Sequence, residues 1–326
     1  MSKREVESMP SDILNQWEPT ISHRYLKIRA HYLQKIRSFF CTRNVLEVET
    51  PLLYEYPVTD PYLDAFEIDT QNGNRYLQTS PEYAMKRLLA NGSGSIFQIC
   101  KAFRDDPEGC HHHYEFTMLE WYRVGFNDKQ LMDEIVLLIQ HIRPEIQVSH
   151  LSYETLFQEY LGINPHTITY EDVKDATFKH IGKIEGLLNP SKDDCLNLLL
   201  THKLEVELAK MELVFIYDYP ESQAALAKVE NNQDGTKVAK RFEAYYKGVE
   251  LANGYYELTD VKIQRKRFQK DLFIRKTENK NLVPVDEKLL AALDYGMPEC
   301  AGVALGLDRL MMVLEDCDDI KEVMYT

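Results

Sequence analysis

The sequence lacks the patterns that would place it in a membrane or mark it for export. None of its apolar runs approaches the roughly 20 residues that a membrane-spanning helix needs. The first twenty residues are polar and charged, without the apolar core of a signal peptide. The six cysteines are scattered, with no Cys-x-x-Cys pair, which favours reduced thiols over a disulfide framework. We therefore expect a cytoplasmic protein.

Basic charge is also scarce. The chain has 38 Lys and Arg against 52 Asp and Glu, a formal net charge of −14. Proteins that grip a nucleic-acid backbone carry a basic stripe, and none is visible here, so the composition argues against such a partner without excluding one. Walker-type phosphate loops, internal repeats and low-complexity linkers are absent from the sequence. Hydrophobic residues make up 44% of the 326, which suffices for a sizeable core and excludes global disorder.

Periodicity predicts helices and strands in the first third of the chain. Apolar residues between 28 and 40 fall on one helical face, and 45–50 has the composition of a strand that ends at Pro51. Ser80-Pro81-Glu82 is typical of a helix start, with Ser as the cap and Pro at the first helical position. Asn91-Gly92 is the expected end of that helix.

Two hairpins and a strand–helix unit follow. Residues 95–104 and 115–124 are extended and joined by a polar loop, and 241–252 forms a second hairpin that turns at Lys247-Gly248. Between them, 149–233 is predicted to be mainly helical with several breaks. Near the end, 302–305 is strand-like and leads into a helix over 307–314. Antiparallel hairpins with helices outside favour an α+β fold, with a mainly antiparallel sheet, over a doubly wound parallel sheet.

The first hairpin carries unusual chemistry on one face. Alternation along 115–124 places four side chains together: Phe116, Met118, Glu120 and Tyr122. A carboxylate and a phenol make a poor core face, because a buried charge must be paired. From this strand alone, a binding face and a solvated sheet face are about equally expected. Arg104, beside Asp105 and Asp106, would by itself more often be a surface ion pair.

The second hairpin adds three carboxylates, Glu243, Glu250 and Glu257. Converging carboxylates repel unless a cation lies between them, and Mg²⁺ with phosphate oxygens is the usual occupant. Strict alternation would put residues 250 and 257 on opposite faces, so we expect a turn or bulge at Asn253-Gly254 to re-aim the later residues. The alternative is an exposed acidic edge.

Two further segments are weak signals alone. In 302–309 the glycines allow a ligand close to the backbone, and Arg309 stands at the start of a helix. Cys110 to His113 could suggest zinc, but one cluster without a second ligand pair is not a zinc pattern.

Together, in this order, the motifs resemble those of class II aminoacyl-tRNA synthetases, specifically the lysyl branch. The segment 36–51, which contains VLEVETP, resembles the first motif of that family. The segment from Phe103-Arg104 through EFTMLEWYR at 115–123 resembles the second motif, and GVALGLDR at 302–309 resembles the third. TSPEYAMKRLL from Thr79 and GVELANGYYELTD from Gly248 also match. The resemblance covers residues 21–326, which we predict to be one catalytic domain behind an N-terminal tail at 1–20.

Within this branch the chain most resembles a family paralogous to the synthetases, the elongation factor P (R)-β-lysine ligases. About twenty residues precede the catalytic domain, too few for the anticodon-binding barrel of lysyl-tRNA synthetases. Ala304 stands where those synthetases have glycine. A methyl group there should crowd an α-amino group, and moving the amine to the β-carbon would relieve the crowding, an effect worth about 1–3 kcal/mol.

The resemblance implies a role for each matching residue. The positions that border or bind the amino acid are Ser80, Pro81, Glu82, Glu120, Tyr122, Asn253, Glu257 and Ala304. The positions of the ATP site are Arg104, Asp105, Asp106, His113, Phe116, Glu250, Leu251, Gly306 and Arg309. Arg104 and Arg309 hold the α- and γ-phosphates and are the catalytic candidates, and Glu243 and Glu250 are the Mg²⁺ candidates. Carboxylates suit a substrate with two ammonium groups.

The implied reaction is in-line attack of the (R)-β-lysine carboxylate on the α-phosphorus of ATP, followed by transfer of the acyl group to a lysine ε-amine of elongation factor P. Positioning and electrostatics then matter more than a protein nucleophile. We expect a homodimer, with no tRNA and no membrane as partner. His113 and Tyr114 depart from the Asn and Pro usual in this family, and Asp106 replaces a Glu, so adenine recognition is expected to differ.

Two other functions remain open from the sequence. A minimal lysyl-tRNA synthetase-like enzyme could act on tRNA or a free amine, against which the missing barrel and the acidity argue. A binding paralogue without catalysis would be expected to lose the phosphate arginines or metal carboxylates, yet Arg104, Arg309, Glu243 and Glu250 are all present.

Overall fold

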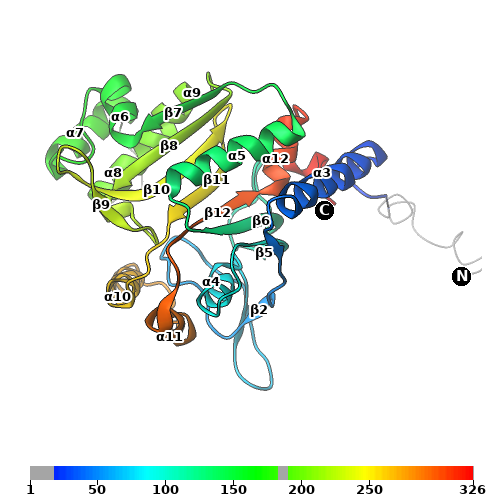
Figure 1. Cartoon of the computed structure of the whole chain (residues 1–326). Helices are drawn as coiled ribbons and strands as arrows, with labels where there is room; N and C mark the ends of the chain where they lie inside the picture. The colour runs from blue at the N-terminus through cyan, green and yellow to red at the C-terminus, as the bar shows by residue number, and fades with distance from the viewer. Residues whose placement is uncertain (1–17, 183–189, 326) are drawn as a thin grey trace, which may run out of the picture.

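One large sheet organises the chain. The computed structural model describes residues 18–182 and 190–325, so most of the predicted tail, 1–17, lies outside the described residues. Among those described, nine strands pair in the order β1-β5-β6-β12-β11-β10-β8-β7, with β9 added beside β10 (Figure 1). Most neighbours are antiparallel, and the pairs β1–β5 and β7–β8 are parallel. The predicted α+β fold with a mainly antiparallel sheet is confirmed.

The strands of this sheet are β1 (Leu46–Glu47), β5 (Ile96–Phe103), β6 (Glu115–Val124), β7 (Val148–Ser152), β8 (Leu213–Pro220), β9 (Val229–Asn231), β10 (Lys237–Tyr246), β11 (Val249–Tyr256) and β12 (Cys300–Gly306). A small second sheet has the order β2-β4-β3. Its strands are β2 (Leu53–Tyr54), β3 (Glu67–Ile68) and β4 (Arg75–Leu77).

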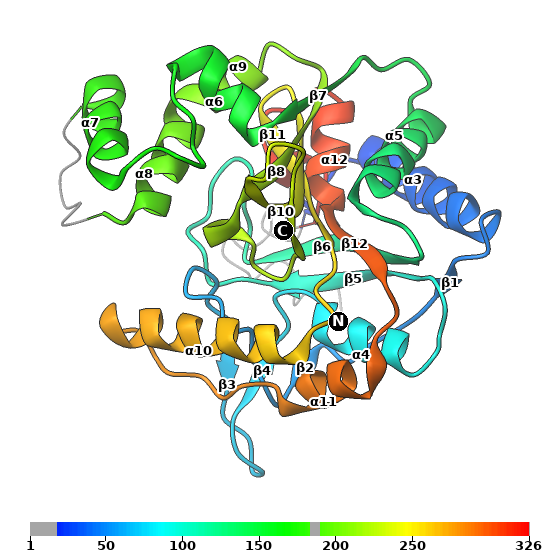
Figure 2. The ribbon, with the colours of Figure 1, turned by 60° about the vertical axis from the view of Figure 1, so that its left-hand side comes forward.

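The helices lie in three groups around the sheet (Figures 1 and 2). They are α3 (His23–Cys41), α4 (Glu82–Ala90), α5 (Asp128–Ile142), α6 (Tyr153–Leu161), α7 (Tyr170–Ile181), α8 (Lys192–Leu199), α9 (Glu205–Leu208), α10 (Val261–Thr277), α11 (Glu287–Gly296) and α12 (Leu307–Leu314). A π-helical turn, Leu200–Leu204, links α8 to α9, and short 3₁₀ turns occur at Glu221–Gln223 and Ile320–Glu322. None of the helices in the described ranges is long and apolar enough to cross a membrane.

The main core lies between one face of the sheet and the helices α3, α5 and α12. Phe40 of α3 stacks on Phe97 of β5 with ring centroids 4.5 Å apart, and Trp121 of β6 packs edge-on against the Phe40 ring. Each such side chain contributes roughly 1.5–3 kcal/mol by its burial. Two smaller clusters pack α6–α9 against β8, and α4 and α11 beneath β5 and β12. The opposite face of the central strands is left to polar side chains.

Local signals fixed most helix ends. Ser22 caps α3, as its hydroxyl accepts a bond from the Tyr25 amide at 3.3 Å. The end of α4 at Asn91-Gly92 is confirmed. Its start is one residue later than predicted, because Pro81, with ψ of 3°, serves as the cap. The Ser80 hydroxyl instead accepts from the Glu82 amide and donates to a carboxylate of β6.

Three other predictions needed correction. The strand predicted over 45–50 pairs only at Leu46–Glu47. The segment 149–233, predicted mainly helical, also contains β7, β8 and β9. In β8, residues 213–216 are buried on both faces, so they show no alternation that would distinguish a strand from a buried helix.

The third correction concerns the bulge in the second hairpin. Asn253 and Gly254 lie in regular register with β12 rather than forming the bulge. The register between β10 and β11 shifts where Ala244 and Tyr245 face Ala252 and Glu250, which leaves Leu251 as the extra residue. A bulge adds one residue and reverses the alternation beyond it. Glu250 therefore faces the same side as Asn253 and Glu257.

Candidate active site

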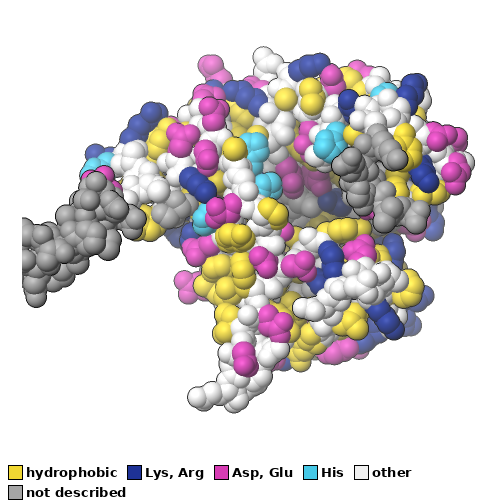
Figure 3. All heavy atoms as spheres, turned by 180° about the vertical axis from the view of Figure 1, so that it is seen from behind, with side chains coloured by type: hydrophobic (Ala, Val, Ile, Leu, Met, Phe, Trp, Pro, Cys, Tyr) yellow, Lys and Arg dark blue, Asp and Glu magenta, His cyan; other side chains and the backbone are white. Residues whose placement is uncertain are grey.

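A cavity of about 900 Å³ lies on the sheet face opposite the main core. Its floor is formed by β6, β12 and β11, and its walls by α4, α10, the loop 58–63 and the start of α8. Figure 3 shows the hollow from behind, with acidic and basic side chains around its rim and in its depth. The cavity collects segments from most of the chain in one place.

Strand register explains how distant residues meet on the floor. One cross-strand row consists of Gln98, Glu120, Ala304, Asn253 and Glu243. The next row consists of Tyr122, Gly302, Tyr255 and Arg241. Directly opposite side chains on neighbouring strands are about 4.5–5.5 Å apart at Cβ. Gln98 and Ile96, the β5 members of the two rows, do not line the cavity, whereas the residues named on β6, β12, β11 and β10 do, so the sheet itself brings the candidate residues together.

Glu120 is the buried carboxylate at the inner end. Its two oxygens accept hydrogen bonds of 2.7 Å from the hydroxyls of Ser80 and Tyr122. It is 1% exposed, and burial, with the Glu82 carboxylate nearby, raises its pKa to about 8. The solvated sheet face considered from the sequence is therefore wrong. A cationic ligand would stabilise the ionised form of this group.

Lys86 joins two other carboxylates, and the sequence interpretation missed it. Its ammonium lies 2.6 Å from Glu82 Oε1 and 2.7 Å from Glu257 Oε2. Burial alone would lower the pKa of Lys86, but Glu257 and Glu82 outweigh it and raise that pKa. The sequence signal that could have pointed to Lys86 is its spacing from Glu82, because residues at i and i+4 share one face of a helix such as α4.

Acceptors without a hydrogen bond mark where a ligand would sit. Glu257 is 0% exposed, and apart from the ion pair with Lys86 its oxygens accept no hydrogen bond. The side-chain oxygen of Asn253 is also buried without a donor. Burial raises the pKa of Glu257 to about 7. Buried unsatisfied acceptors are costly, so an ammonium group placed between them would be bound favourably.

Gly302 leaves space for the Tyr122 ring and the Glu257 carboxylate because it has no side chain. A Cβ on residue 302 would lie 2.3 Å from the Tyr122 ring and 2.4 Å from Glu257 Oε1. At Gly306, which the sequence singled out for a nucleotide, a Cβ would meet only Arg309, at an ordinary 3.7 Å. Within this motif, the glycine that the protein's own packing requires is therefore Gly302.

Two arginines stand at the other end of the cavity. Arg309, near the start of α12, donates 3.0 Å hydrogen bonds to the carbonyl oxygens of His111 and Glu250. The Arg104 guanidinium lies 5.2 Å from the centroid of the Phe116 ring, and its Nε is buried without a partner. Burial lowers the pKa of Arg104, and Arg309 adds to this effect. Two cations that repel each other in one cavity are suited to an anion such as a polyphosphate.

Two carboxylates, Glu243 and Glu250, lie beside these arginines, although the residues that the structure describes contain no group of three or more His, Cys, Asp or Glu side chains arranged to hold a metal ion. Burial and the neighbouring Glu243 raise the pKa of Glu250, a repulsion that a cation would relieve. Glu243 already accepts from Arg241 at 2.5 Å and from the Tyr245 hydroxyl at 2.6 Å, so Glu250 is the more available ligand. Glu205 of α9, which the sequence did not point to, also has its pKa raised to about 7 by burial and by these two carboxylates.

The loop between β5 and β6 contributes at the same end. Asp106 and His113 line the cavity, as does His112. The His113 ring is held by the Glu115 backbone and lies 3.4 Å from Glu108, which does not line the cavity. His113 therefore lies in the cavity wall with its ring held by these contacts.

Sixteen of the eighteen residues predicted from the sequence line this one cavity. They are Ser80, Glu82, Glu120, Tyr122, Asn253, Glu257, Ala304, Arg104, Asp106, His113, Phe116, Glu243, Glu250, Leu251, Gly306 and Arg309. Pro81 is buried at the start of α4 and Asp105 is exposed, with its amide bonded to the Asp64 carbonyl; neither lines the cavity. The structure does not bring these two to the site.

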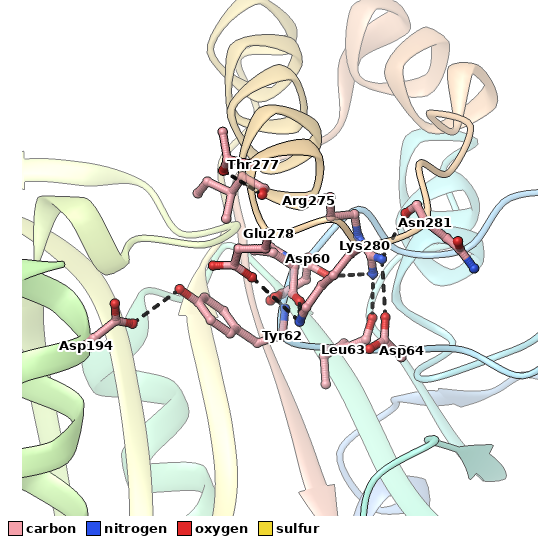
Figure 4. Close-up of polar contacts among 12 residues, drawn as sticks. Asp60, Tyr62, Leu63, Asp64, Asp194, Arg275, Thr277, Glu278, Lys280 and Asn281 are labelled. Carbon is pink, nitrogen blue, oxygen red and sulfur yellow. Dashed lines mark hydrogen bonds and ion pairs between the residues drawn. The ribbon is translucent and has the colours of Figure 1, made fainter. Parts of the chain in front are cut away.

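The outer wall is held by a buried arginine (Figure 4). Arg275, at the end of α10, is 3% exposed and donates to the carbonyl oxygens of Thr59, Asp60 and Leu63. These bonds fix the loop 59–64, from which the Tyr62 hydroxyl reaches Asp194 of α8 at 3.4 Å. The mouth of the cavity is therefore built by α8 and the loop that α10 holds in place.

Fold and cavity together define the class of protein. The family model of class II tRNA synthetases (D, K and N) matches residues 13–325, and the chain belongs to this family. Among curated proteins, the chain is similar to elongation factor P–(R)-beta-lysine ligases. That of Pseudoalteromonas translucida (strain TAC 125) is 46% identical over 321 residues, covering 95% of this chain and 97% of the relative. That of Haemophilus influenzae (strain PittGG) is 44% identical over 317 residues, with the same coverage.

Proposed function

We propose that this protein is a ligase that uses ATP to activate (R)-β-lysine and transfers the β-lysyl group to a lysine ε-amine of elongation factor P. The observation that carries the proposal is the cavity itself. One end holds three carboxylates, Glu82, Glu120 and Glu257, and the other holds Arg104 and Arg309. A diammonium carboxylate and a nucleotide triphosphate would lie head to tail between these ends. The names of the full-length relatives supply the identity of the amino acid and of the acceptor.

In the first step the β-lysine carboxylate attacks the α-phosphorus, the bond to the bridging oxygen breaks, and pyrophosphate leaves. Arg104 would hold the reacting carboxylate and α-phosphate, and Arg309 the outer phosphates, where each offsets the charge that develops on oxygen. Mg²⁺, held by Glu250 with Glu243, would neutralise phosphate charge when bound. Glu120 and Glu257 would fix the two ammonium groups, so that the carboxylate is presented in line.

In the second step the neutral ε-amine of the acceptor attacks the carbonyl of the acyl-adenylate. An amide bond forms, the mixed anhydride breaks, AMP leaves with the electron pair, and the amine nitrogen releases one proton to solvent. The side of the cavity lined by α8 and the loop 59–64 is the proposed entry for the acceptor. We place the enzyme in the cytoplasm and expect it to act as a homodimer without tRNA.

The test is ATP–pyrophosphate exchange with (R)-β-lysine and with α-lysine, together with mass spectrometry of purified elongation factor P. We expect exchange that prefers β-lysine, and one β-lysyl addition to the factor. Exchange with neither amino acid would contradict the proposal. AMP release that requires tRNA rather than elongation factor P would favour the minimal synthetase.

A further inference from the structure

Lys86 is a buried charged group beside the inner half of the cavity, and the proposed reaction gives it no task. It is 2% exposed and lies on α4. Its ammonium makes two ion pairs, with Glu82 on its own helix and with Glu257, which follows β11. Both partners line the cavity, whereas Lys86 lies behind them. It is therefore a neighbour of the ligand-binding groups rather than a group exposed to ligand.

The charges at this end can be counted. Glu82, Glu120 and Glu257 are three carboxylates, and Lys86 is the cation paired within the group. When a bound dication favours the ionised form of all three carboxylates, Lys86 leaves two negative charges, which equals the two ammonium groups of a diamino acid whose carboxylate faces Arg104. Without Lys86, the third carboxylate would have no cation even in that complex, and it would be favoured in its protonated form.

Lys86 also fixes geometry. A buried ammonium at 2.6 and 2.7 Å from two carboxylates holds a helix and a strand at one separation. The remaining lone pairs of Glu257 accept no hydrogen bond in the protein and are left for a ligand. A group held from behind in this way is preorganised, which lowers the cost of binding.

We propose that Lys86 is a positioning residue that fixes Glu82 and Glu257 and sets the charge of the pocket to match a substrate with two ammonium groups. The inference rests on the proposed function, since it assumes that β-lysine occupies this end. It goes beyond that function by assigning substrate selection to a residue that does not touch the substrate.

The test compares Lys86→Met with the wild type in pyrophosphate exchange, measuring KM for β-lysine and for ATP separately. Lys86→Met keeps an unbranched side chain that is one heavy atom shorter and removes its charge. We expect KM for β-lysine at neutral pH to rise by about 10-fold or more, because Glu257 loses the cation that keeps it ionised. KM for ATP should stay within about two-fold. Arg87→Met, an exposed change on the same helix, serves as the control and should alter neither constant.

A pH profile separates this role from a structural one. In Lys86→Met the high KM for β-lysine should fall as pH rises and Glu257 ionises, whereas a general loss of packing would lower activity at every pH. The titratable and charged groups around Lys86 and Glu257 are Glu82 and Tyr83 of α4, Glu120 and Tyr122 of β6, Tyr255 of β11 and Cys300 of β12. The tyrosines and the cysteine stay neutral through this range, because burial raises the pKa of each.

The outcomes are distinct. Unchanged KM for β-lysine in Lys86→Met, or a parallel rise for ATP, would overturn the role of Lys86 while wild-type exchange leaves the proposed function standing. Absence of pyrophosphate exchange in the wild-type protein would instead contradict the proposed function itself. If Lys86→Met does not fold, Lys86→Gln replaces it. The neutral amide can still donate to both carboxylates, and the same shift of KM and pH profile is expected.

Discussion

At the scale of single residues, Glu257 carries the clearest prediction. Its carboxylate is fully buried and accepts no hydrogen bond, so its ionised form has little to interact with except Lys86 and a ligand. We expect Glu257→Gln to raise KM for β-lysine about 10- to 100-fold, since a hydrogen bond to a charged group contributes roughly 1.5–3 kcal/mol. KM for ATP should stay nearly constant. Glu299→Gln, the same substitution at an exposed glutamate, is the control; equal losses for both substrates would refute the assignment.

Ala304 tests selection between lysine isomers. It lies directly between Glu120 and Asn253 in the cross-strand row on the cavity floor. Removing its methyl group should admit an amine on the α-carbon, so Ala304→Gly should raise kcat/KM for α-lysine by about 5- to 100-fold. The measurement is exchange with both isomers. A ratio of α- to β-lysine that does not change would count against the steric explanation.

Gly302 should tolerate no side chain. Gly302→Ala would drive a Cβ into the Tyr122 ring and the Glu257 carboxylate, at 2.3 and 2.4 Å. We expect the variant to lose at least about 10-fold in kcat/KM for β-lysine, because overpacking forces neighbours to move at a cost of roughly 1–3 kcal/mol. Gly306→Ala, where a Cβ meets nothing closer than 3.7 Å, should be folded normally. Equal β-lysine affinity in Gly302→Ala and the wild type would be the contrary result.

The pH dependence of the stability of the protein is predicted from the buried carboxylates of Glu120 and Glu257. Burial raises their pKa values to about 8 and about 7, above the roughly 4.3 of an unfolded glutamate. Their contribution to the free energy of unfolding is therefore fully present below about pH 4 and is lost as pH rises through about 7 to 8. We expect the Tm of the free protein to fall over that upper range, and the increase in Tm caused by β-lysine to grow. A ligand-induced shift independent of pH would contradict this.

At the scale of elements, the end of α10 and the loop 59–64 form one unit. Replacing Arg275 by Met would leave several carbonyl oxygens without their donor, so we expect a loss of about 3 kcal/mol in the free energy of unfolding. Because this loop lines the cavity, KM should rise for both substrates. Arg265→Met, a change on the same helix as Arg275, breaks only an exposed ion pair with Glu287 of α11 and should leave the denaturation midpoint almost unchanged. Similar denaturation midpoints for the two variants would disprove the argument.

Elements with strong local signals could be predicted from the sequence, and those fixed by tertiary contacts could not. The helix after Ser22 and both hairpins follow from periodicity, caps and turns. β8 was missed because burial on both faces removes its alternation, and the bulge at Leu251 was misplaced because Gly254, three positions later, gave the stronger turn signal.

Most of the candidate residues lie together in one cavity, and the sequence pointed to them because they sit in motifs with a family resemblance. The rows across β6, β12 and β11 then explain why those motifs meet. Lys86 was missed because a lysine four residues after a glutamate is usually an exposed helical pair. Nothing in the local sequence shows that Glu257, far along the chain, completes its ion pairs.

At the scale of the whole molecule, net charge should control the encounter with the acceptor. A chain of charge −14 attracts a lysine-bearing loop over about a Debye length, roughly 8–10 Å at physiological salt. We expect kcat/KM for elongation factor P to fall several-fold between about 0.05 and 0.5 M salt, while pyrophosphate exchange changes little. Parallel salt dependence of the two reactions would show that charge acts on the catalytic site and not on the encounter.

The whole account depends on an acidic pocket that recognises two ammonium groups at one end of a nucleotide site. The most direct measurement is kcat/KM in pyrophosphate exchange for (R)-β-lysine and for the β-amino acid in which a methyl group replaces its terminal ammonium. Sites that hydrogen-bond a substrate group reject analogues without it by roughly 10⁴-fold, and we predict discrimination of that order. Comparable activity with both compounds would contradict the account.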